Sequence, residues 1–181
     1  FFNINSMNTL IGRTKTLYLA DVIKTPIHGN SYIFVIKKRP INVYRIDNLI
    51  YLERADGLYN IQTYIKYAEN VQFIKDTLKS MIINYSGHRL VGYGAAAKGM
   101  VALNYFDIDL DYIIDDNPLK HGLYTPGSNI RIYSINKLEQ EESESIIIIP
   151  LAWNFFDEIK MRIQDVRPTN ALDKYIKYFP K

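Results

Sequence analysis

The spacing of apolar residues near the N-terminus predicts a helix followed by two strands. Apolar side chains recur at helical spacing between residues 4 and 11, and the polar residues before them can cap a helix. The segments 16–27 and 28–40 then have the apolar runs of strands, with a turn near His28, which we interpret as structural. Forty residues cannot bury both faces of such a sheet, so we expect another surface to cover it.

A long helix follows a weakly patterned stretch. Residues 40–60 show no clear period, and we interpret them as a connector. From Ile61 to Tyr85, apolar side chains form one helical stripe, and Gly87 stands where a helix C-cap belongs. This segment is therefore predicted to be an amphipathic helix.

The rest of the chain alternates between strand and helix patterns. Strands are predicted over 88–94, 110–116, 129–135, 145–152 and 174–179, and helices over 95–106, 136–142 and 154–166. Such alternation predicts parallel pairing with right-handed crossovers. The expected fold class is α/β, with a doubly wound, Rossmann-like parallel sheet over residues 61–181.

The turn "GYGAAAKG" is the first candidate site. Gly92, Gly94 and Ala97 fit the pattern G-x-G-x-x-G/A between a strand and a helix. In that motif the first glycine allows a tight turn, the second allows close approach of a ligand, and the third position allows close helix packing. Asp115 lies about 20 residues further on, where an acid that binds ribose is expected. The alternative is that the small residues serve packing alone.

Two further stretches follow predicted strands. "DDNPLKHGLYTPGSNI" places Asp116, Asn117, Lys120, His121 and Tyr124 in a loop at the carboxyl end of a strand, where open α/β sheets bind ligands. The alternative is a solvated loop shaped by proline and glycine.

"IPLAWNFFDEI" brings Trp153 and Asn154 to the next turn between a strand and a helix. Trp153 could also be a core residue, and Asn154 could also be the N-cap of the following helix.

Composition excludes several classes of function. The formal net charge is +3 and the basic residues are scattered, so we expect no nucleic-acid partner. The chain has no cysteine, which excludes disulfides and thiolate metal sites, and we expect a cytoplasmic protein. No apolar run approaches the roughly 20 residues of a membrane span, and no signal peptide is visible.

The three stretches together resemble the C-terminal domain of the sugar-nucleotide C-methyltransferases. Their order and spacing agree with that family, and "PIHGNSYIFVIKK" is similar to the end of its methyltransferase domain. The resemblance implies S-adenosylmethionine as cofactor and a deoxysugar linked to a nucleoside diphosphate as substrate, methylated at carbon 3. A histidine that removes the proton next to a keto group is the family's base.

The resemblance also implies what the chain lacks. The family's catalytic motif would lie ahead of Phe1, and its zinc module needs cysteines. We therefore expect no catalytic or metal-binding residue here, and no activity of this chain alone. The implied domains are a remnant of the methyltransferase domain over 1–40, a connector over 41–60 and the C-terminal Rossmann-like domain over 61–181.

The resemblance implies a nucleotide-diphosphate sugar, no membrane, and the N-terminal domains of the same protein as partners. The predicted substrate-binding residues are Gly92, Tyr93, Gly94, Ala95, Ala96, Lys98, Gly99, Asp115, Asp116, Asn117, Lys120, Tyr124, Trp153 and Asn154. Two alternatives stay open: an NAD-binding domain of an oxidoreductase, and a non-catalytic module that binds a nucleotide-sugar.

Overall fold

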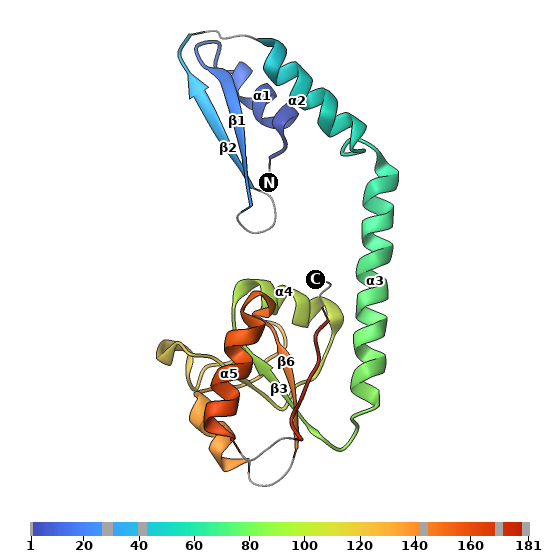
Figure 1. The fold of residues 1–181 in the computed structure, drawn as a ribbon, viewed down its shortest axis with the longest axis vertical. Helices are drawn as coiled ribbons and strands as arrows, with labels where there is room; N and C mark the ends of the chain where they lie inside the picture. Colours follow the sequence, from blue (N-terminus) through green and yellow to red (C-terminus); the bar gives the residue numbers. More distant parts are fainter. Residues whose placement is uncertain (1, 27–30, 40–42, 142–144, 169–171, 179–181) are drawn as a thin grey trace. The chain divides into compact units, whose positions relative to one another are not determined.

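A computed structural model describes residues 2–26, 31–39, 43–141, 145–168 and 172–178. The chain forms two compact units, Phe1–Glu69 and Asn70–Lys181, and each is described by itself. Figure 1 follows the chain from the hairpin of the first unit to the sheet of the second. The turn predicted at His28 lies outside the described residues.

The first unit contains the predicted helix and hairpin, followed by a second helix. Helix α1 spans Ile4–Gly12, and strands β1, Tyr18–Thr25, and β2, Ser31–Lys37, pair antiparallel. Its small core holds side chains from α1, β1 and α2: Ile4, Ile11, Leu19, Val22 and Ile46.

The segment interpreted as a connector contains helix α2, Val43–Ala55, which packs against α1 and β1. Glu53 of α2 is buried and accepts hydrogen bonds from the Ile4 backbone N–H at 2.9 Å and the Tyr59 hydroxyl at 2.6 Å. The sequence did not predict α2, because its apolar residues show only a weak helical period. Part of its packing comes instead from the Glu53 carboxylate, which binds the first turn of α1.

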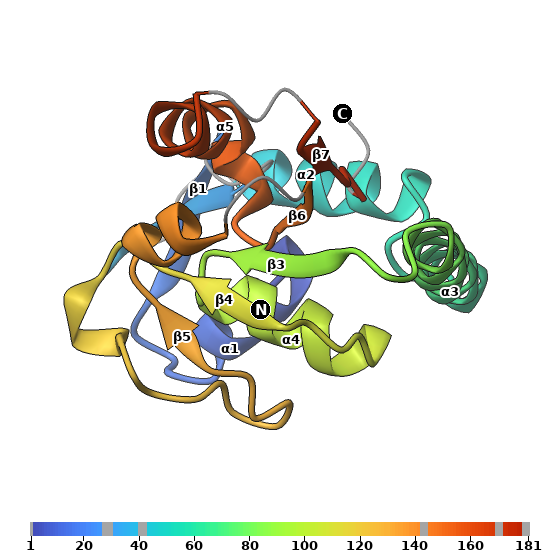
Figure 2. The ribbon, with the colours of Figure 1, turned by 90° about the horizontal axis from the view of Figure 1, so that it is seen from below.

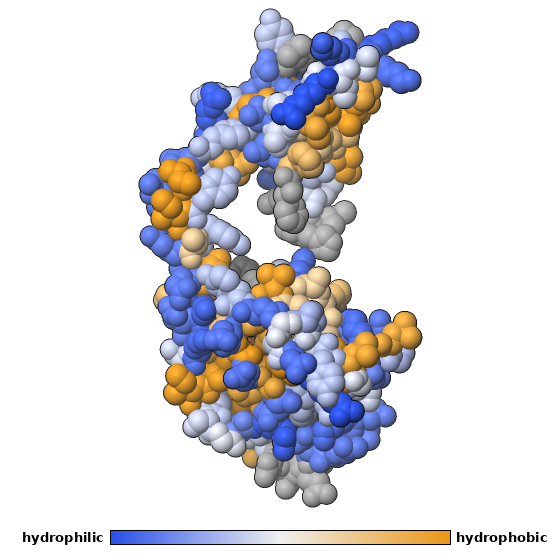
Figure 3. Space-filling view, turned by 180° about the vertical axis from the view of Figure 1, so that it is seen from behind, coloured by the Kyte–Doolittle hydropathy of each residue, from blue (hydrophilic) through white to orange (hydrophobic). Residues whose placement is uncertain are grey.

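One side of the hairpin remains uncovered within the first unit. Figure 3 shows apolar side chains gathered over the hairpin. Ile23 and Ile33, which pair with each other across the two strands, are about half exposed there. This agrees with the expectation that the hairpin needs a further surface.

The second unit is a five-stranded parallel sheet in the order β5-β4-β3-β6-β7. The strands are β3 Arg89–Tyr93, β4 Tyr112–Ile114, β5 Ile132–Tyr133, β6 Ile146–Pro150 and β7 Lys174–Tyr175. Every residue of β6 is buried, as its continuous run of isoleucines predicts for an inner parallel strand.

Helices cover both faces of this sheet. Helix α4, Ala97–Phe106, packs with the second half of α3, Ile61–Ile83, on one face. On the other face lie α5, Phe156–Val166, and the 3₁₀ helix η2, Ile135–Gln140. Figure 2 shows α4 and α5 on opposite sides of the strands. The predicted doubly wound α/β fold is confirmed.

Helix α3 differs from its prediction. Only Leu78 of the predicted stripe is fully buried, and Ile61 is 66% exposed. The helix passes from one unit into the other, and the residues that pack on the core of the second unit, Val71, Ile74 and Ile82, lie in its second half. Gly87 has φ +89° but lies in the turn after the helix, not directly at its end. Among the described residues, no helix has the length and apolar character of a membrane span.

Candidate functional site

The candidate site is a cavity at the carboxyl edge of the sheet. Strand β3 pairs with β4 on one side and β6 on the other, so the connections leave in opposite directions and open a crevice. The cavity there measures about 430 Å³. Its lining residues are Tyr93, Gly94, Ala96, Asp115, Asp116, Ala152, Phe155, Glu158, Ile159 and Arg162.

Gly92 has a different structural role from the one that the glycine motif predicts. It lies inside β3, and a Cβ atom there would come within 2.8 Å of Leu110 and 2.9 Å of Ile113. The turn itself is made by Gly94, with φ +97°. The tight-turn function predicted for Gly92 is therefore wrong: its small size serves packing of the sheet core.

Gly94 and Gly99 meet protein rather than open space. A Cβ on Gly94 would lie 2.7 Å from the Cβ of Ala152, and one on Gly99 would lie 2.7 Å from the Cβ of Leu151. Leu151 and Ala152, the two residues after β6, thus occupy the space where these Cβ atoms would lie. The close approach that the motif reserves for a ligand is used here by the chain itself.

Asp115 is buried and its oxygens are engaged. It is 6% exposed, and its Oδ2 accepts from the Ala95 N–H at 2.7 Å and from Lys120 Nζ at 2.9 Å. Its Oδ1 accepts from the Asn117 N–H at 2.9 Å. The residue predicted to bind ribose therefore holds the glycine turn and the next loop together.

Neighbouring loop residues strengthen the same connection. Lys120 also donates to the Ala95 carbonyl at 2.9 Å, and His121 Nε2 donates to the Asp115 carbonyl at 2.8 Å. The Asn117 side chain accepts from the Leu119 N–H at the start of η1, Pro118–Lys120. Asn117 and Lys120 lie beside the cavity rather than in its lining.

Asp116 has a different environment from Asp115. Its side chain is 49% exposed, and Oδ1 accepts from the Tyr93 hydroxyl at 2.8 Å and from Arg162 Nη1 at 2.6 Å. Burial, with the hydrogen bond to Asp116, raises the pKa of the Tyr93 phenol to about 12. Asp116 thus joins a buried phenol from β3 to a guanidinium from α5.

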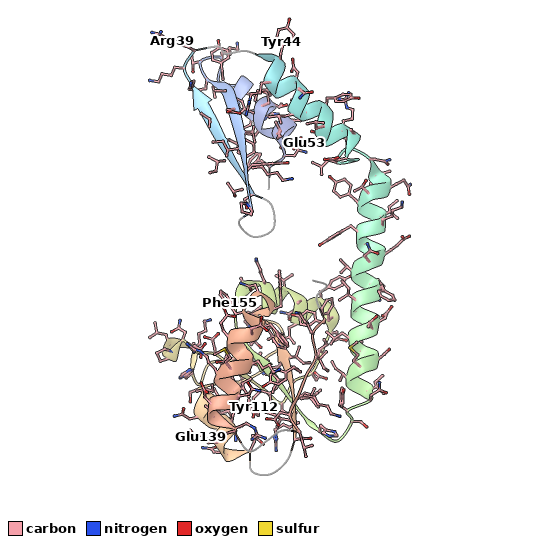
Figure 4. The ribbon with its side chains drawn as sticks, viewed as in Figure 1. Arg39, Tyr44, Glu53, Tyr112, Glu139 and Phe155 are labelled. Carbon is pink, nitrogen blue, oxygen red and sulfur yellow. The ribbon has the colours of Figure 1, made fainter. Side chains whose placement is uncertain are left out.

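The wall formed by Phe155, Glu158, Ile159 and Arg162, called the α5 wall below, was not predicted. These residues follow the i, i+3, i+4, i+7 spacing of one helix face, which the sequence does show. The glycine motif drew attention to the turns, whereas a helix face with one buried residue is typical of any amphipathic helix. Figure 4 shows Phe155 at the N-terminal end of α5, with Tyr112 and Glu139 toward the opposite end.

The remaining predicted residues lie around the cavity rather than in its lining. Lys98 Nζ stands 5.9 Å from the centre of the Trp153 ring. Asn154 is exposed in the 3₁₀ turn η3, Trp153–Phe155, and Phe155 precedes α5, so the N-cap prediction for Asn154 is wrong.

Tyr124 forms a bridge with Arg131, within the connection between β4 and β5, and is not in the cavity lining. Across the described ranges, no group of three histidine, aspartate or glutamate side chains is placed to hold a metal ion.

Comparison with known proteins bears on this site. No curated protein sequence matches the chain. The family model described as the C-methyltransferase C-terminal domain matches residues 26–180, which include every strand of the sheet and the whole lining of the cavity. The chain therefore belongs to the C-methyltransferase C-terminal domain family.

Proposed function

We propose that this chain is the C-terminal, substrate-binding part of a C-methyltransferase that uses S-adenosylmethionine and acts on a keto-deoxysugar linked to a nucleotide. Membership of the C-methyltransferase family supports the methyl-transfer chemistry. The observation that carries the binding role is the cavity at the switch point of the sheet, where this class of fold places its ligands. The catalytic base belongs, in this proposal, to other domains of the same protein.

The two buried acids that the structure describes, Glu53 and Asp115, do not offer a site for the methyl donor. A site for its adenosine would need a carboxylate with free oxygens near the ribose. Glu53 is engaged by Ile4 and Tyr59, and Asp115 is engaged by the two loops it joins. Neither of these two buried acids fits, so no residue here is assigned a part in methyl transfer.

The geometry argues against the NAD alternative. A dinucleotide needs the space over the second glycine for its pyrophosphate and an acid for its ribose. Ala152 fills that space over Gly94, and Asp115 already accepts three hydrogen bonds. The non-catalytic module differs from our proposal only in the activity of the whole protein.

Ligand binding separates these functions. Saturation-transfer NMR on the chain is expected to show binding of thymidine diphosphate glucose and no binding of NAD. Strong NAD binding without sugar-nucleotide binding would contradict the proposal. Methylation assays with a 4-keto nucleotide-sugar and S-adenosylmethionine are expected to show no activity of this chain alone, and turnover by it would refute the absence of a base.

A further inference from the structure

The charges of the cavity lining do not favour a bound diphosphate. Asp116 is paired with Arg162, and Asp115 is paired with Lys120 at 2.9 Å. The charges of these four side chains therefore sum to zero. Glu158 forms no ion pair with any residue that the structure describes, and it leaves the lining with an excess negative charge. A diphosphate inside the cavity would lie against an uncompensated carboxylate, which is a repulsive arrangement.

Arg162 is not a free anion-binding group. Its Nη1 lies 2.6 Å from Asp116 Oδ1, and the same oxygen accepts from Tyr93. If Arg162 turned to a phosphate, Asp116 would lose its cation and stand next to the new negative charge. The Arg162–Asp116 pair is therefore better suited to a neutral ligand, to which the Asp116 carboxylate can present hydrogen-bond acceptors.

The rest of the lining suits a neutral ring. Phe155 is 52% exposed, and it lines the cavity together with Ala152 and the buried Ile159. An aromatic face offers flat apolar area to the C–H face of a ring, while carboxylate oxygens only accept hydrogen bonds. A ligand that fits both is apolar on one face and carries hydroxyl donors at its edge.

We infer that the cavity takes the sugar ring of the nucleotide-sugar against Phe155, with Glu158 accepting a hydrogen bond from a sugar hydroxyl and the diphosphate lying outside the cavity. This inference rests on the proposed function, since it assigns parts of the proposed ligand to places in the site. It makes Glu158 a residue that sets ligand orientation and selects for a hydroxyl donor.

Replacing Glu158 by glutamine gives effects of opposite sign for the two orientations. If Glu158 accepts from a hydroxyl, Glu158→Gln removes a charge-assisted bond and weakens binding roughly tenfold. If a diphosphate faces Glu158, the same change removes a repulsion and tightens binding. The probe is thymidine diphosphate glucose, and its dissociation constant is measured by titration calorimetry on the full chain.

Asp157→Asn is the matched control. Asp157 and Glu158 are both exposed acids in the first turn of α5, so both changes remove one charge from the same helix end. Asp157 is not part of the cavity lining, and its variant is expected to bind within about twofold of wild type.

Each outcome decides between the orientations. Weaker binding by Glu158→Gln with unchanged binding by Asp157→Asn supports the inference. Unchanged or tighter binding by Glu158→Gln, with normal binding by wild type, overturns the inference and leaves the proposed function standing. Absence of binding by folded wild-type protein overturns the proposed function and the inference with it.

Discussion

The glycine turn over residues 92–99 and the α5 wall lie on the same cavity but use their residues in different ways. The turn has its small residues packed against Ala152 and Leu151, and its backbone tied to Asp115. The α5 wall presents Phe155, Glu158 and Arg162, each more than a third exposed. The turn therefore builds the edge of the sheet, and the helix supplies the side chains that a ligand can reach.

This difference separates two kinds of evidence. A glycine motif indicates that something approaches the backbone closely, and here that something is the chain itself. Accessible polar groups beside an aromatic ring indicate a ligand more directly. Substitutions in the turn should therefore affect folding, whereas substitutions in the α5 wall should affect binding.

The largest expected effect on folding is at Asp115. Asp115→Asn places an amide N–H₂ against donors that the carboxylate now satisfies, and it removes the partner of Lys120. We expect a loss of about 3 kcal/mol in the free energy of unfolding. Urea unfolding followed by the fluorescence of Trp153 measures it. The exposed control Asp109→Asn should change the value by less than about 0.5 kcal/mol.

Gly94→Ala comes next. The residue has φ +97° and a Cβ would meet Ala152 at 2.7 Å, so the variant combines backbone strain with a clash. We expect a loss of about 2 to 3 kcal/mol in the same urea assay. Gly122→Ala is the control, since Gly122 has φ +81° but open space around it. Equal losses in both variants would show that packing over Gly94 contributes nothing.

Tyr93 connects the glycine turn to the α5 wall through Asp116. Its substitution should have a smaller effect on the free energy of unfolding. Tyr93→Phe removes the hydrogen bond to Asp116, at a cost of about 1 kcal/mol at neutral pH. Because the pKa of the phenol is raised to about 12 in the folded protein, the phenol keeps its proton to a higher pH there than in the unfolded chain.

The raised pKa of Tyr93 contributes fully to the free energy of unfolding below about pH 10, and this contribution falls as the pH rises toward 12. Stability of Tyr93→Phe should therefore decline less steeply above pH 10 than stability of wild type. Urea unfolding at a series of pH values from 7 to 11 tests this, and identical slopes for the two proteins would refute it.

Phe155→Leu should have the smallest effect on folding, below about 0.5 kcal/mol, because the ring is half exposed. Binding of thymidine diphosphate glucose should weaken roughly threefold to tenfold, since the leucine side chain lacks the flat aromatic face. Phe73→Leu makes the same change at an exposed position of α3 outside this cavity and should leave binding unchanged. Titration calorimetry measures both.

The alternating pattern after Arg89 was enough to predict the sheet, because a buried parallel strand such as β6 needs a continuous apolar run. Helix α2 escaped prediction, since a buried carboxylate, Glu53, contributes to its packing instead of a full apolar stripe. Asp115 and Asp116 are adjacent in sequence and both line the cavity. The Asp115 oxygens bind the two loops, whereas Asp116 joins Tyr93 to Arg162. Only the folded loops decide which groups each carboxylate contacts, so the site could not be predicted from residue types.

The most direct test of the α5 wall as the ligand-binding surface is a crystal structure of the chain with thymidine diphosphate glucose. We predict the sugar ring against Phe155, a hydroxyl within hydrogen-bond distance of Glu158, and the diphosphate outside the cavity. A diphosphate lying over Gly94, with Ala152 displaced from its present contact, would contradict this and return the glycine turn to the part its motif predicts.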